Sequence, residues 1–200
     1  MRLSIKRSLT AKILCLSLGA SFLMAATYGW VLPRIQERLF QEKRLMTRHV
    51  VETAVSVASH FQALQSAGKL TPEQARSSAK AVLRDMRYGD NEYFWITDHR
   101  PVIIMHPFSP KLVNTDASKI KDKAGKYLFQ EMVRAAKNKA GGFVDYLWPK
   151  PGEKKPVPKV SFVKEVPGWG WLIGSGIYVD DVTKEVNVLI LRISGLALAI

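Results

Sequence analysis

The sequence is nearly devoid of cysteine, because Cys15 is its single thiol in 200 residues. This cysteine lies in an apolar segment near the N-terminus, so the rest of the chain lacks the side chain needed for disulfides, thiolate metal sites or a cysteine nucleophile. A serine elbow is missing as well, since Ser175 has glycine neighbours without the Gly-x-Ser-x-Gly spacing. Gly168, Gly170 and Gly174 do not have the spacing of a dinucleotide-binding loop. With no catalytic acid and base pair in view, we predict that the chain is not an enzyme and uses no cofactor.

Histidine is also scarce, with 4 residues in the chain. His49 and His60 fall near the same side of a predicted helix, but no carboxylate or cysteine close to them completes a ligand set. We therefore predict no metal site.

Acidic residues are absent from the N-terminal segment, which instead contains Arg2, Lys6, Arg7 and Lys12. Residues 13–32 carry no charge at all, and about 20 apolar residues suffice for a helix to cross a bilayer. Basic residues beside a first span hold that side in the cytoplasm. We predict a cytoplasmic segment at 1–12, a transmembrane helix at 13–32 and an exported chain beyond it, in a bacterial inner membrane with the domain in the periplasm or outside the cell.

A cleaved signal peptide is the alternative for this segment, and Ala25-Ala26 is partly consistent with it. The apolar run is longer than the roughly 7 to 15 residues of a signal peptide, and Met24 occupies a position where a cleavage site requires a small residue. These features favour an uncleaved anchor.

A second apolar run covers residues 186–200, and Arg192 is its single charged residue. The run is short for a complete span, and an arginine near a helix start can extend its side chain to the interface. We predict that residues 186–200 begin a second transmembrane helix that is cut short, which leaves residues 33–185 as the extracytoplasmic domain.

The net charge of +13 is an excess of basic over acidic residues. Part of it lies in the membrane ends, so the exported part is only moderately basic. Such a surface suits anionic ligands or anionic lipid, but no nucleic-acid motif accompanies it. We predict no nucleic-acid partner.

Residues 33–67 contain no internal proline or glycine, and apolar residues recur there at helical spacing. This pattern predicts a long amphipathic helix that continues outward from the membrane and would expose apolar surface in a monomer, so we expect a homodimer. Gly68 ends the helix. Thr71-Pro72 predicts the start of a second helix, which extends to about Met86.

Beyond residue 90 short β-branched and aromatic runs alternate with turn residues, a pattern typical of strands. Five strands are predicted at 93–97, 102–106, 142–148, 159–166 and 171–179, with a helix at 126–138 and a basic hairpin loop at 149–156. The order of elements predicts an α+β fold with one antiparallel sheet and helices on one of its faces. A cavity facing the helices is then the expected ligand site.

Two stretches carry a resemblance to a known family: EYFWITDHRPVIIMHPFSPKLVN and GFVDYLWPKPGEKKPVPKVSFVKEVPGWGWLIGSGIYVDDV. From about Arg84 to Val182 the chain resembles the single Cache domain, type 2, of chemoreceptors and sensor histidine kinases. The resemblance implies a PAS-like five-stranded sheet, a long N-terminal helix used in dimerisation, and small organic acids such as acetate, propionate, pyruvate or lactate as ligands. The chain departs from the family pattern at Arg100-Pro101, where an Asp-x-x-Gly turn is common, and at Asn114, where glycine is common.

A small carboxylate in an apolar pocket requires a cation or several N–H donors. Lys159 is the first candidate, because it opens a predicted strand in the family motif PKVSFV, and His106 in MHP is the second. The aromatic residues of the first and third predicted strands share a face in pairs and can form the pocket wall. The complete set of predicted ligand-binding residues is Lys159, His106, Tyr93, Trp95, Tyr146, Trp148, Met105, Arg87 and Tyr178.

These features predict the ligand-sensing domain of a transmembrane signalling receptor, of the chemotaxis receptor or sensor kinase type, that binds a small organic acid. The alternative is a membrane-anchored periplasmic module that binds a protein or an anionic glycan through the basic hairpin at 149–156. The alternative requires steep salt dependence and no stabilisation by small molecules.

The topology can be tested with reporter fusions. A reporter placed before Arg2 should behave as cytoplasmic and one inserted beside Glu153 as exported, because the basic residues precede an uncharged span. A cytoplasmic signal from the fusion at Glu153 would contradict the sensor hypothesis.

Overall fold

The computed structural model describes residues 9–89 and 91–198. The chain divides into two units, of which one comprises Met1–Leu39 with Val186–Ile200 and the other Phe40–Glu185. Helix α1 (Leu9–Ser66) and helix α4 (Val179–Leu198) each contribute to both units. The sheet and the remaining helices belong to the second unit.

In the first unit, α1 confirms the predicted helix at 13–32. Within the described part of the chain, α1 is the one helix long and apolar enough to cross a membrane. Residues 1–8 of the predicted cytoplasmic segment lie outside the described residues. Helix α4 begins at Val179 and thus several residues before the predicted apolar start. The second span stays a prediction, and its residues 199–200 also lie outside the described part.

The second unit is built on a six-stranded antiparallel sheet. Five strands follow the order β1-β2-β6-β5-β4, and the sixth, β3, also pairs with β2. The strands are β1 (Arg87–Tyr88), β2 (Glu92–Asp98), β3 (Ile103–Met105), β4 (Gly142–Pro149), β5 (Pro156–Val166) and β6 (Trp171–Tyr178). The helices are α2 (Pro72–Asp85), the 3-10 turn η1 (Pro110–Leu112) and α3 (Leu128–Ala136). All five predicted strands are present. The sequence did not reveal β1 or η1, which are too short to produce a periodic pattern.

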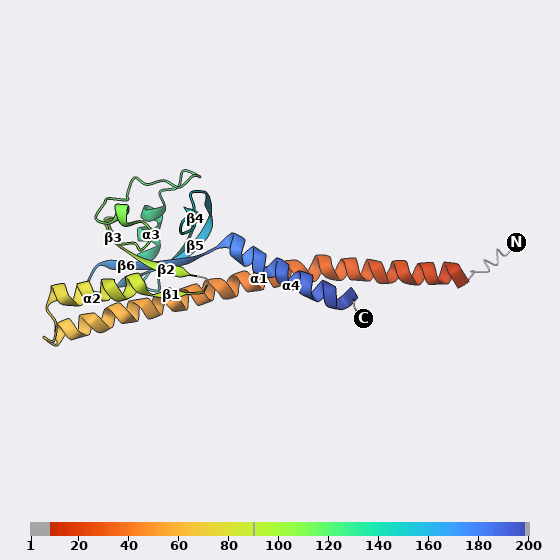
Figure 1. Cartoon of the computed structure of the whole chain (residues 1–200), viewed down its shortest axis with the longest axis horizontal. Helices are drawn as coiled ribbons and strands as arrows, with labels where there is room; N and C mark the ends of the chain where they lie inside the picture. The colour runs from red at the N-terminus through yellow and green to blue at the C-terminus, as the bar shows by residue number, and fades with distance from the viewer. Residues whose placement is uncertain (1–8, 90, 199–200) are drawn as a thin grey trace. The chain divides into compact units, whose positions relative to one another are not determined.

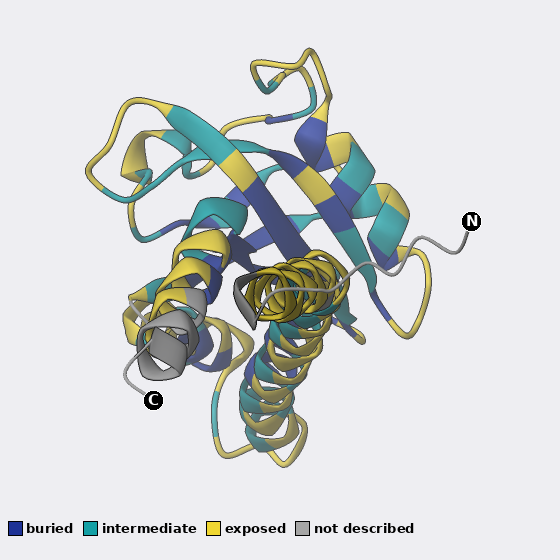
Figure 2. Cartoon of the chain, turned by 90° about the vertical axis from the view of Figure 1, so that its right-hand side faces the viewer, coloured by how far each residue is buried: buried dark blue, intermediate teal, exposed yellow. Residues whose placement is uncertain are grey.

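Helices cover both faces of the sheet, so the predicted coverage of a single face is wrong. Figure 1 shows α2 and the C-terminal part of α1 on one side of the sheet and α3 on the other. Alternate residues of β2 divide accordingly: Phe94 and Ile96 pack with α1 and α2, whereas Tyr93 and Trp95 pack with α3. Every residue of β6 is buried, as two covered faces require. Figure 2 shows buried, intermediate and exposed stretches along the strands.

The amphipathic stripe of α1 is largely covered by its own sheet. Val51, Ala54, Val55 and Ala58 are buried in the cluster that contains β2 and β6 residues. The apolar surface from which we predicted a homodimer is therefore mostly satisfied within one chain. The homodimer itself stays a prediction.

Local sequence signals set the boundaries of α2 and of two turns. Thr71 caps α2 as predicted, because its hydroxyl accepts a hydrogen bond from the Gln74 amide and the Gln74 side chain accepts one from the Thr71 amide. Asp98 closes the turn at Arg100-Pro101 by accepting hydrogen bonds from the amides of Arg100 and Val102. Asn114 has φ +62°, in the left-handed region where asparagine is the usual substitute for glycine.

Candidate ligand-binding site

Strand β5 carries Lys159 into the interior of the domain. Its register places Lys159 between Tyr146 of β4 and Tyr178 of β6. Side chains alternate along a strand, and Val163, four residues further on, packs in the cluster with α3. Lys159 therefore projects toward the α3 side of the sheet, and the residue is 1% exposed.

Aromatic rings surround the ammonium group of Lys159. Its Nζ atom lies 4.2 Å from the ring centroid of Tyr93, 4.2 Å from that of Tyr178 and 5.7 Å from that of Trp95. Ring faces attract a cation, but they do not replace the hydrogen bonds that water supplies. The cage thus holds a charged group that is only partly compensated.

Two buried donors converge on this region without an acceptor. Within the described residues, neither Lys159 Nζ nor Trp95 Nε1 has a hydrogen-bond partner. An unsatisfied buried donor costs about 1–3 kcal/mol, and more when it is charged. A ligand oxygen that accepts hydrogen bonds from these donors would offset this cost. The site therefore favours a negatively charged ligand with hydrogen-bond acceptors.

His106 adds a third donor. Its Nδ1 atom accepts hydrogen bonds from the amides of Phe108 at 3.2 Å and Ser109 at 3.0 Å. Burial, together with the nearby charge of Lys159, lowers the pKa of His106 to about 3, so the ring is neutral. The proton of a neutral imidazole that accepts at Nδ1 resides on Nε2, which makes Nε2 a donor.

Glycines in β6 make room for these side chains. A Cβ atom on Gly174 would collide with the ring of Trp95, and one on Gly176 would collide with Ser161 Oγ and lie 2.5 Å from the Val160 carbonyl oxygen. Ser161 Oγ in turn forms a 2.9 Å hydrogen bond with the Tyr146 hydroxyl. The sequence Gly174-Ser175-Gly176 thus allows Trp95 and Tyr146 to occupy the α3 side of the sheet.

A small cavity of about 10 Å³ lies among these groups. Its polar and aromatic wall comes from the strands and from His106, and its apolar wall comes from Leu128, Phe129 and Met132 of α3. This volume is close to the minimum for one water molecule. A bound organic acid therefore requires the walls to separate.

The structure brings together seven of the nine predicted residues. Tyr93, Trp95, His106, Tyr146 and Trp148 line the cavity. Lys159 does not line it, but its Nζ atom lies over the rings of Tyr93 and Trp95, which do, and over the ring of Tyr178. Met105 packs in the cluster with α1 and α2, and Arg87 is exposed, with its guanidinium donating to the carbonyls of Arg84 and Met86.

Sequence reasoning missed the contribution of α3, although its apolar spacing was a usable signal. It also missed Phe108, whose ring packs edge-on against Tyr93 at a centroid distance of 4.9 Å.

The electrostatics of the site centre on Lys159. Burial lowers the pKa of Lys159 to about 7. The nearby Glu92 carboxylate raises this pKa, but by less than burial lowers it. Burial raises the pKa of the hydroxyls of Tyr93, Tyr146 and Tyr178, so these groups are neutral at physiological pH. Lys159 is therefore the group of this set whose charge changes near neutral pH, and the Glu92 carboxylate favours its ammonium form.

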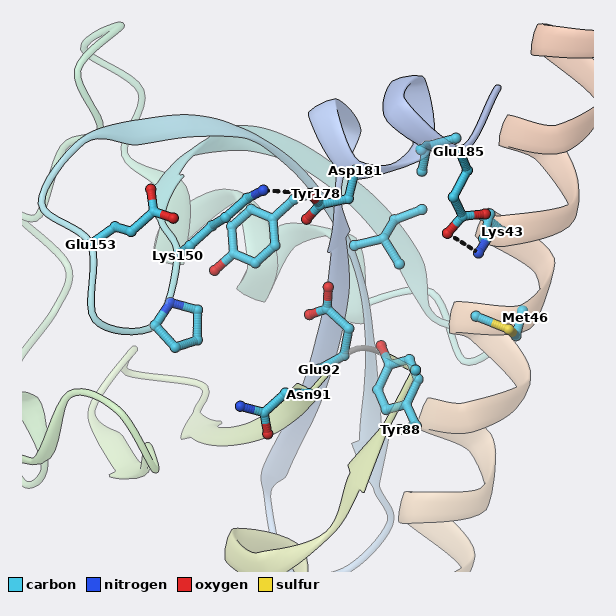
Figure 3. Close-up of a pocket in the computed structure, with 14 residues that line it drawn as sticks. Lys43, Met46, Tyr88, Asn91, Glu92, Lys150, Glu153, Tyr178, Asp181 and Glu185 are labelled. Atoms are coloured by element: carbon cyan, nitrogen blue, oxygen red, sulfur yellow. Dashed lines mark hydrogen bonds and ion pairs between the residues drawn. The ribbon is translucent and has the colours of Figure 1, made fainter. Parts of the chain in front are cut away.

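A second, larger cavity of about 330 Å³ is lined by Tyr178 and by residues of α1, the β4–β5 hairpin and the start of α4 (Figure 3). Lys150 of the hairpin reaches across to Asp180 at 2.8 Å and Asp181 at 2.6 Å. The Tyr178 hydroxyl donates to the Pro149 carbonyl at 2.9 Å. Tyr178 therefore contacts both the aromatic cage and the connection from the hairpin to α4.

Comparison with known proteins places this geometry in a family. The family model described as Single Cache domain 2 matches residues 39–190. The methyl-accepting chemotaxis protein McpP of Pseudomonas putida is 47% identical over 155 residues, which are 78% of this chain and 28% of McpP. CtpM of Pseudomonas aeruginosa, also a methyl-accepting chemotaxis protein, is 30% identical over 196 residues, or 92% of this chain and 34% of CtpM. The chain thus spans about a third or less of these relatives.

Solved structures show the same fold. A periplasmic sensor domain of a chemotaxis protein aligns with a TM-score of 0.69 and 45% identity over 71% of this chain and 99% of that one. A Cache chemosensory domain, described for its recognition of carboxylic acids, aligns with a TM-score of 0.68 and 48% identity over 72% of this chain and 97% of that one. Both solved chains contain little besides this domain, so segment 40–185 is suited to study in isolation.

The burial of Lys159 predicts how stability depends on pH. The folded-state pKa of about 7 lies below the ordinary value of 10.5, so between these values the unfolded state binds a proton that the folded state does not. The free energy of unfolding of segment 40–185 should therefore rise from pH 7 to 9, by at most about 1.4 kcal/mol per unit. Lys159→Met should remove this rise and should be more stable than wild type at pH 7. Urea unfolding at pH 7, 8 and 9 measures both effects.

Lys155→Met is the matched control, because Lys155 is exposed in the hairpin. It should keep the wild-type slope. Equal slopes in wild type and Lys159→Met would show that Lys159 is solvated.

Proposed function

Because the chain belongs to the Single Cache domain 2 family, we propose that it is the extracytoplasmic sensing part of a transmembrane receptor and binds a small organic acid through Lys159. The observation that carries this proposal is the buried, unpartnered Nζ atom of Lys159 beside the unpartnered Nε1 atom of Trp95. A carboxylate supplies two oxygens and one negative charge, which match these two donors and the ammonium charge. The carboxylic acid recognition described for the similar Cache domain supports this ligand class.

The ligand class is limited by the cavity. Acetate, propionate, pyruvate and lactate pair one carboxylate with a short carbon chain. The carboxylate would face Lys159, Trp95 and His106, and the carbon chain would face Leu128, Phe129 and Met132. A neutral His106 can also donate to a keto or hydroxyl oxygen.

Binding and conformational change are linked in this proposal. The acid enters by separating α3 from the strands, and its carboxylate draws the Lys159 ammonium away from the Tyr178 ring. Tyr178 ends β6 and α4 begins at the next residue, Val179. A shift of Tyr178 would move the start of α4, where Lys150 binds Asp180 and Asp181. The ligand would change the receptor state because its contacts differ between the two arrangements.

The alternative, an interaction module that uses the basic hairpin, receives less support. Lys150 is engaged in internal salt bridges and its side chain is 15% exposed. Lys154 and Lys155 remain exposed, a modest charge for binding an anionic macromolecule.

The carboxylate site can be tested by thermal melting of segment 40–185 with acetate, propionate, pyruvate and lactate. A ligand at about 100 times its dissociation constant should stabilise the wild type by roughly 2.7 kcal/mol. Lys159→Met and His106→Phe should each weaken binding at least about tenfold, because each leaves ligand oxygens without a donor. Lys155→Met should bind like wild type. Unchanged affinity in both site variants would reject the site, and stabilisation only by polyanions with steep salt dependence would favour the interaction module.

We also propose that the receptor is a homodimer in which the exposed side of α1 faces its partner. The exposed residues recur at helical spacing: Leu45, His49, Thr53, Ser56 and His60. In a Cys15→Ser background, cysteine at Leu45 or Thr53 should crosslink in membranes under mild oxidation. Cysteine at the adjacent buried Ala54 should not, because that residue is 0% exposed. Failure of both exposed positions to crosslink would count against this dimer.

A further inference from the structure

Lys159 faces titratable groups from every strand that packs around it. From β2 come Glu92 and Tyr93, from the end of β3 His106, from β4 Tyr146 and from β6 Tyr178. The three residues of α3 at the cavity, Leu128, Phe129 and Met132, are apolar. Lys150 lies beyond Tyr178, 5.4 Å from its ring centroid, and is paired with Asp180 and Asp181.

Most of these groups do not change charge near neutral pH. His106 has its pKa lowered to about 3, and burial raises the pKa of the three tyrosine hydroxyls further above their ordinary value. Lys159 differs, because burial lowers its pKa to about 7 against the attraction of Glu92. In the described structure it forms neither a hydrogen bond nor a salt bridge within 4.0 Å.

An arriving carboxylate changes this balance. A negative charge in contact with Nζ favours the ammonium over the amine, since opposite charges at close range stabilise the charged form. In a site that excludes water the preference is strong. A domain with a neutral Lys159 amine must therefore acquire a proton when the anion binds. The solvent or buffer gives up this proton, which forms an N–H bond at Nζ, while the carboxylate itself is chemically unchanged.

We propose that the domain takes up one proton with each carboxylate that it binds, so that the receptor responds to the undissociated acid, the product of anion and proton concentrations, and not to the anion alone. This inference rests on the proposed carboxylate site. A lysine that is always charged would bind the anion without taking up a proton. The inference therefore adds to the carboxylate site both the species that is sensed and a dependence on pH.

The sign of the pH effect follows from linkage. Above about pH 7 the amine dominates in the free domain, so binding consumes a proton and the dissociation constant should rise about tenfold per pH unit. Below about pH 6 Lys159 is already an ammonium and the affinity for the anion should be nearly constant. An acid at a fixed total concentration would thus give a stronger signal in acidified surroundings.

Calorimetry of the whole chain in detergent measures the proton directly. Acetate, propionate, pyruvate and lactate are titrated at pH 7 and pH 8, each in two buffers that differ in ionisation enthalpy. The difference in heat should show net proton uptake with each bound acid, and the uptake should be larger at pH 8 than at pH 7. Equal heats in both buffers at pH 8 would overturn this inference and leave the carboxylate site intact. Binding of none of the acids would overturn both.

Variants assign the proton to Lys159. Lys159→Arg keeps the positive charge without titrating, so any binding it retains should be independent of pH and free of proton uptake. Glu92→Gln removes the carboxylate that favours the ammonium, so proton uptake at pH 7 should be larger than in the wild type. His99→Gln, at an exposed histidine on the turn after β2, should leave uptake at the wild-type value. Uptake that persists in Lys159→Arg, or that does not increase in Glu92→Gln, would place the proton elsewhere and overturn the assignment.

Discussion

The interaction on which the site depends is the contact of one buried ammonium group with aromatic rings. Lys159 is 1% exposed, and its Nζ atom lies 4.2 Å from two tyrosine ring centroids. Rings attract the cation without accepting the hydrogen bonds that water would accept, so part of the desolvation cost stays uncompensated. This cost lowers the pKa of Lys159 and leaves its Nζ atom without a hydrogen-bond partner among the described residues.

The rest of the domain is arranged to hold that ammonium in place. The two covered faces bury all of β6 and the central residues of β5, including Lys159, and the glycines of β6 allow Trp95 and Tyr146 to lie over the sheet. Tyr178 contacts both the cage and the hairpin, because its ring lies beside Lys159 and its hydroxyl donates to the Pro149 carbonyl, and α4 begins at the next residue. The same side chain can therefore take part in both ligand binding and signalling, with no separate relay.

Much of the fold followed from local pattern. The uncharged run at 13–32, the Thr71-Pro72 start of α2 and the five runs of β-branched and aromatic residues each have a physical cause that acts over a few neighbouring residues. Lys159 and His106 were proposed as ligand-binding residues because family motifs contain them, and an isolated lysine beside a basic hairpin would otherwise be assigned to the surface. Met105 shows the limit of such reasoning, since a β-bulge in the β2–β3 pairing accompanies its placement in the other cluster.

The sequence by itself determined the elements, their order and the residue types available for recognition, because helix spacing, strand alternation and capping are local properties. Only the tertiary structure decided which face of the sheet each strand residue occupies, that α3 closes the cavity, and that the stripe of α1 is covered by its own domain. These outcomes depend on strand order and register, which bring Tyr146, Lys159 and Tyr178 side by side from three separate strands. The tertiary structure also decides the pKa of Lys159, because desolvation depends on everything packed around a residue and not on its neighbours in sequence.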